Sequence, residues 1–221
     1  MKRYQGVIFD LDGTLLDTLD DLTDSINFTL QQYGLPSCSK IQTASYLGYG
    51  SQVYLEKASG GKLNPEQFAE CLDTYKTYYA AHMNQKTKPF SEILPLLESL
   101  QQAGIYTAVV SNKFDAAVKG LCQQYFGNRI DFAIGEGHGL RPKPNGDMLQ
   151  AVAKKWGIAL QDCIYIGDTE VDLQTAKNAN MPCIAVSWGF RTKNQLLDFG
   201  ANCIVDTPEE LKNILLGKDR L

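Results

Sequence analysis

Two carboxylates stand at the end of the first apolar run of the chain. Residues 7–9, Val-Ile-Phe, are followed by Asp10 and, two positions on, by Asp12. A short run of β-branched and aromatic residues predicts a buried strand. In a parallel α/β sheet, ligands bind just beyond the carboxyl ends of the strands. Two neighbouring carboxylates repel each other, and a hard cation such as Mg²⁺ would stabilise both. The alternative interpretation is a solvated Asp-Gly turn.

A hydroxyl and two lysines further along could hold a phosphate group. Ser111 follows the apolar run at 106–110, and Asn112 and Lys113 come next. A hydroxyl with neighbouring backbone N–H groups can bind phosphate oxygens. Lys143 stands between two prolines, which stiffen the segment that presents its charge. Taken singly, a strand that ends in Ser-Asn is typical of a turn, and a lysine is typical of the solvated surface.

A third pair of acids follows another apolar run. Residues 164–166, Ile-Tyr-Ile, precede Gly167 and Asp168, and Asp172 comes four positions later. We expect Asp168 to join Asp10 and Asp12 at a metal site, and Asp172 to position the metal or its waters from the next helix. A Gly-Asp pair at a strand end is common, but its combination with the earlier acids and a lysine is far more specific.

These segments resemble, in order along the chain, the four signatures of the haloacid dehalogenase (HAD) superfamily. They are Asp10-Leu11-Asp12-Gly13-Thr14-Leu15, Val109-Val110-Ser111-Asn112, Arg141-Pro142-Lys143-Pro144 and Ile164-Tyr165-Ile166-Gly167-Asp168-Thr169-Glu170-Val171-Asp172. The resemblance covers nearly the whole chain. It implies that Asp10 is a nucleophile that forms an aspartyl phosphate. It also implies that Asp12 acts as general acid and then as general base.

The same resemblance implies a cofactor and a phosphate site. Mg²⁺ would be held by a carboxylate oxygen of Asp10, the backbone carbonyl of Asp12 and the carboxylate of Asp168, with Asp172 in a supporting position. The expected substrate-binding residues of the core are Thr14, Ser111, Asn112, Lys113 and Lys143. The haloalkanoic dehalogenases of the superfamily lack an acid at the position of Asp12, so that activity is excluded.

The helical pattern of residues 17–86 predicts a cap domain. Apolar residues recur there at helical spacing, and 64–67 has the form of a helix start, with a cap residue, a proline and a glutamine. From about residue 93, strand and helix patterns alternate. We therefore expect an α/β fold, a Rossmann-like, mostly parallel three-layer sandwich over 1–16 and 87–221, with an all-helical cap at 17–86. HAD enzymes commonly carry a helical cap at this point.

The glycine loop of the cap bears on substrate choice. Gly48, Tyr49 and Gly50 resemble the cap loop of phosphoglycolate phosphatases, and we expect them to bind substrate, with Tyr49 as the side chain presented to it. Family members commonly have an arginine shortly before this loop, whereas this chain has Ala44 and Ser45. That departure argues against phosphoglycolate itself as the substrate.

Charge, apolar runs and cysteine spacing limit which classes of binding partner are expected. The net charge of −4 argues against nucleic acid, which needs a clustered basic surface. No early run resembles a signal peptide or a membrane span, so we expect a cytoplasmic protein without a membrane partner. The six cysteines are scattered, which favours reduced thiols over a zinc knuckle or a disulfide framework. The expected partner is a small phosphorylated metabolite, and the chain would be a monomer or a homodimer.

The sequence leaves three alternative functions open. The first is a Mg²⁺-dependent phosphatase of small phosphate monoesters that resembles phosphoglycolate phosphatase. The second is a mutase of the same superfamily, similar to β-phosphoglucomutase, which would pass the phosphoryl group to a second hydroxyl. The third is a non-catalytic binding protein on a HAD fold, and the intact set of acids and lysines argues against it.

Overall fold

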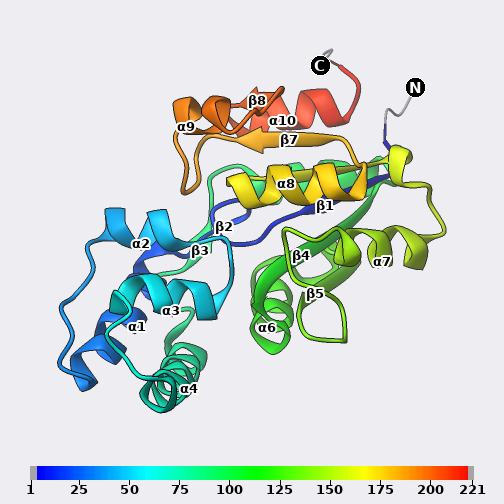
Figure 1. Cartoon of the computed structure of the whole chain (residues 1–221). Coiled ribbons are helices and arrows are strands. Elements are labelled where there is room, and N and C mark those ends of the chain that lie inside the picture. The colour runs from blue at the N-terminus through cyan, green and yellow to red at the C-terminus, as the bar shows by residue number, and fades with distance from the viewer. Residues whose placement is uncertain (1–3, 219–221) are drawn as a thin grey trace.

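The computed structural model describes residues 4–218, and its centre is a six-stranded sheet. All strand pairs of this sheet are parallel, in the order β5-β4-β1-β6-β7-β8 (Figure 1). The strands are β1 (Gly6–Phe9), β4 (Tyr106–Phe114), β5 (Phe132–Glu136), β6 (Cys163–Gly167), β7 (Cys183–Val186) and β8 (Ile204–Val205). Because β1 lies between β4 and β6 and all three strands are parallel, their carboxyl ends lie next to one another at the same edge of the sheet.

Helices cover both faces of the sheet. One face carries α5 (Ile93–Gln102), α6 (Asp115–Phe126) and α10 (Pro208–Leu215), and the other carries α7 (Asp147–Trp156) and α8 (Glu170–Ala179). Along β1, Val7 and Phe9 face the first of these hydrophobic layers and Ile8 faces the second, as the period of a strand requires. Burial on both faces explains why 7–9 is continuously apolar. The expected α/β three-layer sandwich is confirmed.

Shorter elements complete this part of the chain. They are α9 (Lys193–Asp198), which the sequence pattern did not predict, and two 3₁₀ turns, Gly127–Arg129 and Leu160–Asp162.

Four helices form a separate group with a hydrophobic cluster of its own. They are α1 (Leu19–Gln32), α2 (Lys40–Tyr46), α3 (Ser51–Ser59) and α4 (Pro65–His82) (Figure 1). The chain enters and leaves this group through β2 (Leu16–Asp17) and β3 (Lys88–Pro89), which pair antiparallel. The division at 16/17 and 86/87 stays a prediction; we call 17–86 the cap and the remainder the core.

Helices α4 and α1 of the cap begin in different ways. The Asn64 side chain accepts from the Gln67 N–H at 2.9 Å, and the Gln67 side chain accepts from the Asn64 N–H at 3.1 Å, which confirms the expected capping box. Thr18 precedes α1, but its side chain makes no cap hydrogen bond. Its backbone has ψ near 0° instead of the extended conformation of a capping residue.

Strand β4 is longer than the apolar run that predicts it. It continues to Phe114, so Ser111, Asn112 and Lys113 lie within the strand instead of after it. The register with β5 shifts between Val110 and Phe114, and such an irregularity redirects the side chains next to it. The polar segment can therefore face the site while the backbone still belongs to the sheet.

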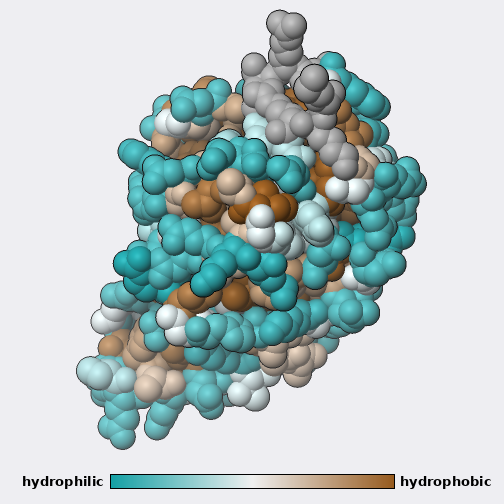
Figure 2. Space-filling model, turned by 90° about the vertical axis from the view of Figure 1, so that its right-hand side faces the viewer, coloured by the Kyte–Doolittle hydropathy of each residue, from teal (hydrophilic) through white to brown (hydrophobic). Residues whose placement is uncertain are grey.

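Hydrophilic residues cover much of the face in Figure 2, with smaller hydrophobic groups between them. Among residues 4–218, no helix combines the length and the apolar composition of a membrane span. All six cysteines are free thiols, as the scattered spacing predicts.

Candidate active site

The ends of β1 and β6 bring three acids together. Asp10 follows β1, and its N–H donates to the carbonyl of Ile166 on β6 at 2.8 Å. Asp168 follows β6, and Asp172 belongs to the first turn of α8. One carboxylate oxygen from each of Asp10, Asp168 and Asp172 lies within 4.8 Å of the others. The fold thus gathers three of the four acids that the sequence analysis singled out.

All three carboxylates are buried, and this alters their protonation. Burial raises the pKa of Asp10 to about 7 despite the opposing attraction of Lys143. Burial, followed by the charges of Asp172 and Asp10, raises the pKa of Asp168 well above its usual range. Burial opposes the ionisation of Asp172 too, but Lys143 outweighs it and leaves the pKa of Asp172 below its ordinary value. The cluster holds more acid than its one lysine neutralises.

Lys143 is the cation of this cluster. Its Nζ lies 2.8 Å from Oδ1 of Asp10 and 2.8 Å from Oδ1 of Asp172, and it donates to the hydroxyl of Tyr165 at 3.1 Å. Burial disfavours the charge of Lys143, but the two carboxylates outweigh burial and raise its pKa. The ammonium therefore stays charged beside Asp10, where the sequence analysis expects it.

Asp168 is fixed from two directions by groups of the core. The hydroxyl of Thr14 donates to its Oδ1 at 2.9 Å, and the N–H of Phe190 donates to its Oδ2 at 2.7 Å. A Cβ on Gly189 would lie 2.3 Å from that same Oδ2, so the close approach requires glycine. Thr14, for which substrate binding stays a prediction, thus contacts Asp168 and positions it.

The acids fit a hard divalent cation. Oδ1 of Asp10 is buried and, among residues 4–218, accepts no hydrogen bond; its contact with Lys143 is an ion pair only. Each oxygen of Asp172 accepts two hydrogen bonds, from Lys143 and Tyr165 at Oδ1 and from the N–H and hydroxyl of Thr169 at Oδ2, whereas each oxygen of Asp168 accepts one. Asp10 and Asp168 thus keep more acceptor capacity and can serve as carboxylate ligands of the kind that Mg²⁺ prefers, while Asp172 holds its neighbours in place.

Asp12 lies outside this cluster and faces a second lysine. Nζ of Lys113 is 2.9 Å from Oδ1 of Asp12 and donates to the hydroxyl of Tyr79, on α4, at 2.6 Å. Both side chains of the ion pair are mostly buried. Lys113 therefore connects the expected general acid to a cap helix.

Ser111 and Asn112 come from β4 to the same place. Both are buried, and Oγ of Ser111 accepts from the N–H of Lys113 at 3.2 Å. The Asn112 amide accepts from the N–H of Lys143 at 2.8 Å, and it donates to the carbonyls of Lys143 and Gly48 at 2.9 and 3.0 Å. One side chain thus fixes the lysine segment of the core and the glycine loop of the cap together.

A pocket lies between the core and the cap. It holds about 590 Å³ of empty space, part of it open to solvent. Its lining residues are Asp10, Asp12, Leu22, Leu47, Gly48, Gly50, Ser51, Tyr54, Tyr75, Tyr79, Ser111, Asn112, Lys113, Phe114, Lys143, Thr169 and Phe190. The two acids of the first signature thus face a cavity whose other side is built by the cap.

Tyr49 is not among the residues that line this pocket. Gly48 and Gly50 both line it, and both have positive φ, 117° and 89°. This turn leaves the Tyr49 side chain partly exposed, with Nζ of Lys57 5.2 Å from its ring. Gly48 and Gly50 therefore lie at the pocket, whereas the Tyr49 side chain between them does not.

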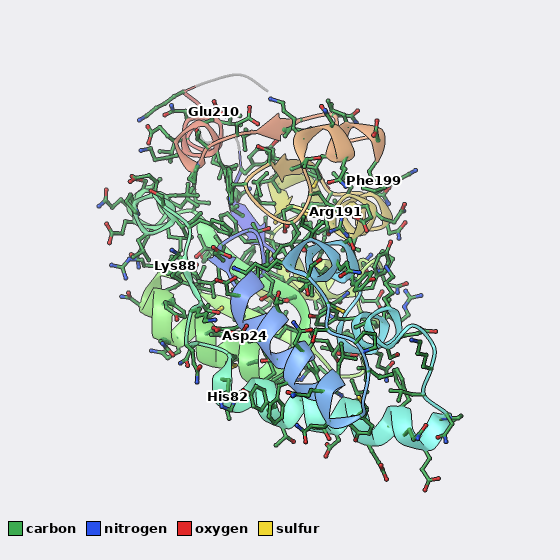
Figure 3. The ribbon with its side chains drawn as sticks, turned by 90° about the vertical axis from the view of Figure 1, so that its left-hand side faces the viewer. Asp24, His82, Lys88, Arg191, Phe199 and Glu210 are labelled. Carbon is green, nitrogen blue, oxygen red and sulfur yellow. The ribbon has the colours of Figure 1, made fainter. Side chains whose placement is uncertain are left out.

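Sequence reasoning missed Arg191, which lies in the core after β7 and is 5% exposed. Its guanidinium donates to both carboxylate oxygens of Glu170, at 2.7 and 2.9 Å, and to the carbonyls of Ala44 and Leu47 in the cap, at 2.6 and 3.1 Å. Figure 3 places it between the core and the helices of the cap. No pattern of residue types marks Arg191 in the sequence, because two of the groups that it contacts are backbone carbonyls.

A family model described as haloacid dehalogenase-like hydrolase matches residues 7–186, which is more than half of the chain. The chain belongs to this family. It is 30% identical over 213 residues to the phosphoglycolate phosphatase of Xanthomonas campestris pv. campestris (strain 8004), and the match covers 96% of each protein. It is 26% identical over 215 residues to the N-acetylmuramic acid 6-phosphate phosphatase of Pseudomonas aeruginosa, over 96% of this chain and 95% of that one.

A solved structure agrees with these relatives. A protein from Lactobacillus delbrueckii subsp. bulgaricus, provisionally described as a phosphoglycolate phosphatase, superposes with a TM-score of 0.92 at 37% identity, covering 97% of this chain and 99% of that one. The expected family, the fold and the enzyme class of a phosphoric monoester hydrolase are confirmed.

Proposed function

We propose that this protein is a Mg²⁺-dependent phosphatase that hydrolyses small phosphate monoesters through an aspartyl phosphate, in the manner of phosphoglycolate phosphatase. The observation that carries the proposal is the placement of Asp10 and Asp12 at one wall of a pocket, with a buried lysine beside each. That arrangement gives a nucleophile, a proton donor and the positive charge that a phosphoryl group needs.

Asp10 is the nucleophile of the first step. Its carboxylate oxygen forms the new bond to phosphorus as the bond to the ester oxygen breaks, which leaves an aspartyl phosphate. Asp12 gives its proton to the departing oxygen, so the product leaves as a neutral alcohol. In the second step Asp12 takes a proton from water, whose oxygen attacks phosphorus and restores the Asp10 carboxylate.

The remaining core residues bind and stabilise charge. Lys143 lies 2.8 Å from Asp10 and stays charged, so it offers its ammonium to the phosphoryl oxygens as negative charge spreads over them. Ser111 lines the same wall and adds a hydroxyl donor. Asp10, Asp168 and the backbone carbonyl of Asp12 would hold Mg²⁺, which would neutralise more of the phosphoryl charge when bound.

The test is phosphate release from a panel of small phosphate esters, including p-nitrophenyl phosphate. We expect activity with Mg²⁺, its loss on exhaustive chelation with EDTA and its return when Mg²⁺ is added back. Asp10→Asn should reduce phosphate release at least 1,000-fold without loss of the fold, because a neutral amide cannot attack phosphorus. Asp24→Asn, at an exposed position on α1, is the matched control.

Turnover by Asp10→Asn at more than a few per cent of the wild-type rate would show that Asp10 is not the nucleophile. Release of inorganic phosphate in a single turnover separates hydrolysis from transfer to a second substrate hydroxyl, which would yield a phosphorylated product instead.

A further inference from the structure

The half of the pocket away from Asp10 is built mainly by the cap, and it must accommodate whatever carries the phosphate. Its cap residues come from α1, from the loop before α3, and from α3 and α4: Leu22, Leu47, Gly48, Gly50, Ser51, Tyr54, Tyr75 and Tyr79. The core adds Phe114 and Phe190. None of these ten residues bears a charge at neutral pH. This half of the pocket is therefore apolar and aromatic.

The cations that line the pocket already have carboxylate partners. Lys143 lies between Asp10 and Asp172, and its side chain is 2% exposed. Lys113 pairs with Asp12 and donates to Tyr79, and its side chain is 5% exposed. A carboxylate on the leaving group would thus have to take one of these ammoniums from the acid that it pairs with in the free protein, among rings and leucines. Separating a buried ion pair in this way is unfavourable.

The start of α3 does not supply the missing charge. Ser51 begins this helix at the pocket wall, and Gly50 before it offers no side-chain cap. A helix N-terminus carries only about half an elementary charge, and the effect fades within the first turn. It can orient a polar atom of a substrate, but it does not balance a full carboxylate.

Tyr75 provides a neutral polar contact in this half of the pocket. The hydroxyl of Tyr54 donates to the carbonyl of Leu22, and that of Tyr79 accepts from Lys113, whereas the Tyr75 hydroxyl has no hydrogen bond to another of the described residues. Tyr75 is 3% exposed and its ring packs edge-on against Tyr54 and parallel to Tyr79. Burial raises the pKa of Tyr75 well above its ordinary value, so the hydroxyl stays a donor.

Building on the proposed phosphatase activity, we infer that the leaving group this site selects is an uncharged alcohol with an apolar face, and not a carboxylate-bearing one such as glycolate. The rings of the cap cover its apolar face, and Tyr75 donates to one polar atom on it. A sugar-like leaving group with many hydroxyls fits less well, because Ser51 and Tyr75 offer few partners and buried hydroxyls left unpaired are costly.

The decisive comparison uses two esters of the same size that differ in charge: 2-phosphoglycolate and its carboxamide. The kcat/KM of the purified protein with Mg²⁺ should be at least tenfold higher for the carboxamide. Equal values, or a preference for 2-phosphoglycolate, would overturn the inference. Failure to hydrolyse either ester or p-nitrophenyl phosphate would instead count against the proposed function, so the two failures are distinguishable.

A charge placed in the pocket provides an independent check. Ser51→Lys puts an ammonium at the wall of the leaving-group half, and we expect it to shift the carboxamide-to-carboxylate ratio at least fivefold toward 2-phosphoglycolate. Ser45→Lys places the same charge on α2, at an exposed position outside the pocket lining, and should leave the ratio unchanged. An equal shift in both variants would mean that long-range charge, and not the pocket, determines the preference.

The contact with Tyr75 is tested by Tyr75→Phe, which keeps the ring and removes the hydroxyl. Its kcat/KM should fall about tenfold more for the carboxamide than for methyl phosphate, which has no atom that reaches this half of the pocket. Tyr46→Phe, on α2 and outside the pocket lining, is the control. An equal fall for both esters would assign Tyr75 to the stability of the cap and remove it from substrate selection.

Discussion

At the scale of single residues, the charge balance of the site depends on one ammonium, that of Lys143, which lies among buried acids. Lys143 contacts Asp10 and Asp172, while Asp168 lies beside both acids without a cation of its own. Breaking a buried ion pair from one side leaves an uncompensated charge, which costs far more than the pair contributes while it is intact. We therefore expect the stability of the protein and the proposed binding of phosphate to depend on the same side chain.

We predict that Lys143→Met destabilises the protein by roughly 3–5 kcal/mol in the absence of metal, because it leaves adjacent buried carboxylates without their cation. Urea denaturation in EDTA measures this change, and addition of Mg²⁺ should recover part of it. Phosphate release should fall at least 100-fold, since a donor aimed at developing charge is lost.

Lys88→Met, at an exposed position on β3, is the matched control for this variant and should change stability by less than about 0.5 kcal/mol. If Lys143→Met were as stable as the wild type without metal, the acids would already be neutral in the resting protein, and Lys143 would not be their counter-charge.

At the scale of elements, the loop between α2 and α3 is held on the core by groups far away in sequence. Arg191 donates to the carbonyls of Ala44 and Leu47, and Asn112 donates to the carbonyl of Gly48. Ala44 is in the last turn of α2, where helix carbonyls lack partners of their own. The guanidinium thus completes the end of a cap helix from the core, and Glu170 fixes its orientation.

We predict that Arg191→Met loosens this loop and leaves the chemistry of the core in place. It should destabilise the protein by about 2–4 kcal/mol, because Glu170, the buried carbonyl of Leu47 and the partly buried carbonyl of Ala44 lose their donor. Amide hydrogen exchange over residues 44–50 should become at least tenfold faster, and KM should rise more than kcat falls.

The matched control for the loop is Arg129→Met, which removes a surface ion pair with Glu98 and should cost less than about 1 kcal/mol. Unchanged exchange over residues 44–50 in Arg191→Met would mean that Asn112 and the packing of Gly48 hold the loop without the guanidinium.

Much of this arrangement could be predicted from the sequence, and the reasons are local. Apolar runs that end at Asp10 and Asp168 predict strand ends, and parallel neighbours bring such ends to one edge. The contact between Arg191 and Ala44 could not be predicted, because it joins residues 147 positions apart through a backbone carbonyl, which carries no side-chain signature. Likewise, the direction of Tyr49 depends on the positive φ of the glycines on either side of it, and two-residue strands such as β2 are too short to leave a pattern.

At the scale of the whole molecule, the junction between cap and core depends on one carboxylate. Asp21 is 3% exposed and lies in the first turn of α1. It accepts from the N–H of Lys86, from the N–H of Thr87 and from the hydroxyl of Thr87, at 2.8–3.0 Å. The start of the cap is thus tied to the segment through which the chain returns to the core.

We predict that Asp21→Ala destabilises the protein by about 2–3 kcal/mol, because three donors lose a charged acceptor and two of them are backbone groups. Thermal unfolding measures the loss, and hydrogen exchange at the Lys86 and Thr87 amides locates it. Asp24→Ala, on the same helix, removes only an exposed ion pair with Lys86 and should change stability by less than about 1 kcal/mol. Equal effects of the two variants would mean that Lys86 itself, and not the Asp21 carboxylate, holds the junction.

The pairing of β2 with β3 has a consequence for how such a protein can be altered. Leu16 lies opposite Pro89 and Asp17 opposite Lys88, so the chain departs for the cap and comes back at neighbouring positions. Segments inserted at such a point can be exchanged or excised with little disturbance of the host domain, because its two cut ends are already adjacent. We therefore expect that a different segment spliced between Asp17 and Lys88 would leave the acids and the lysine of the core in place and change which phosphate esters reach them.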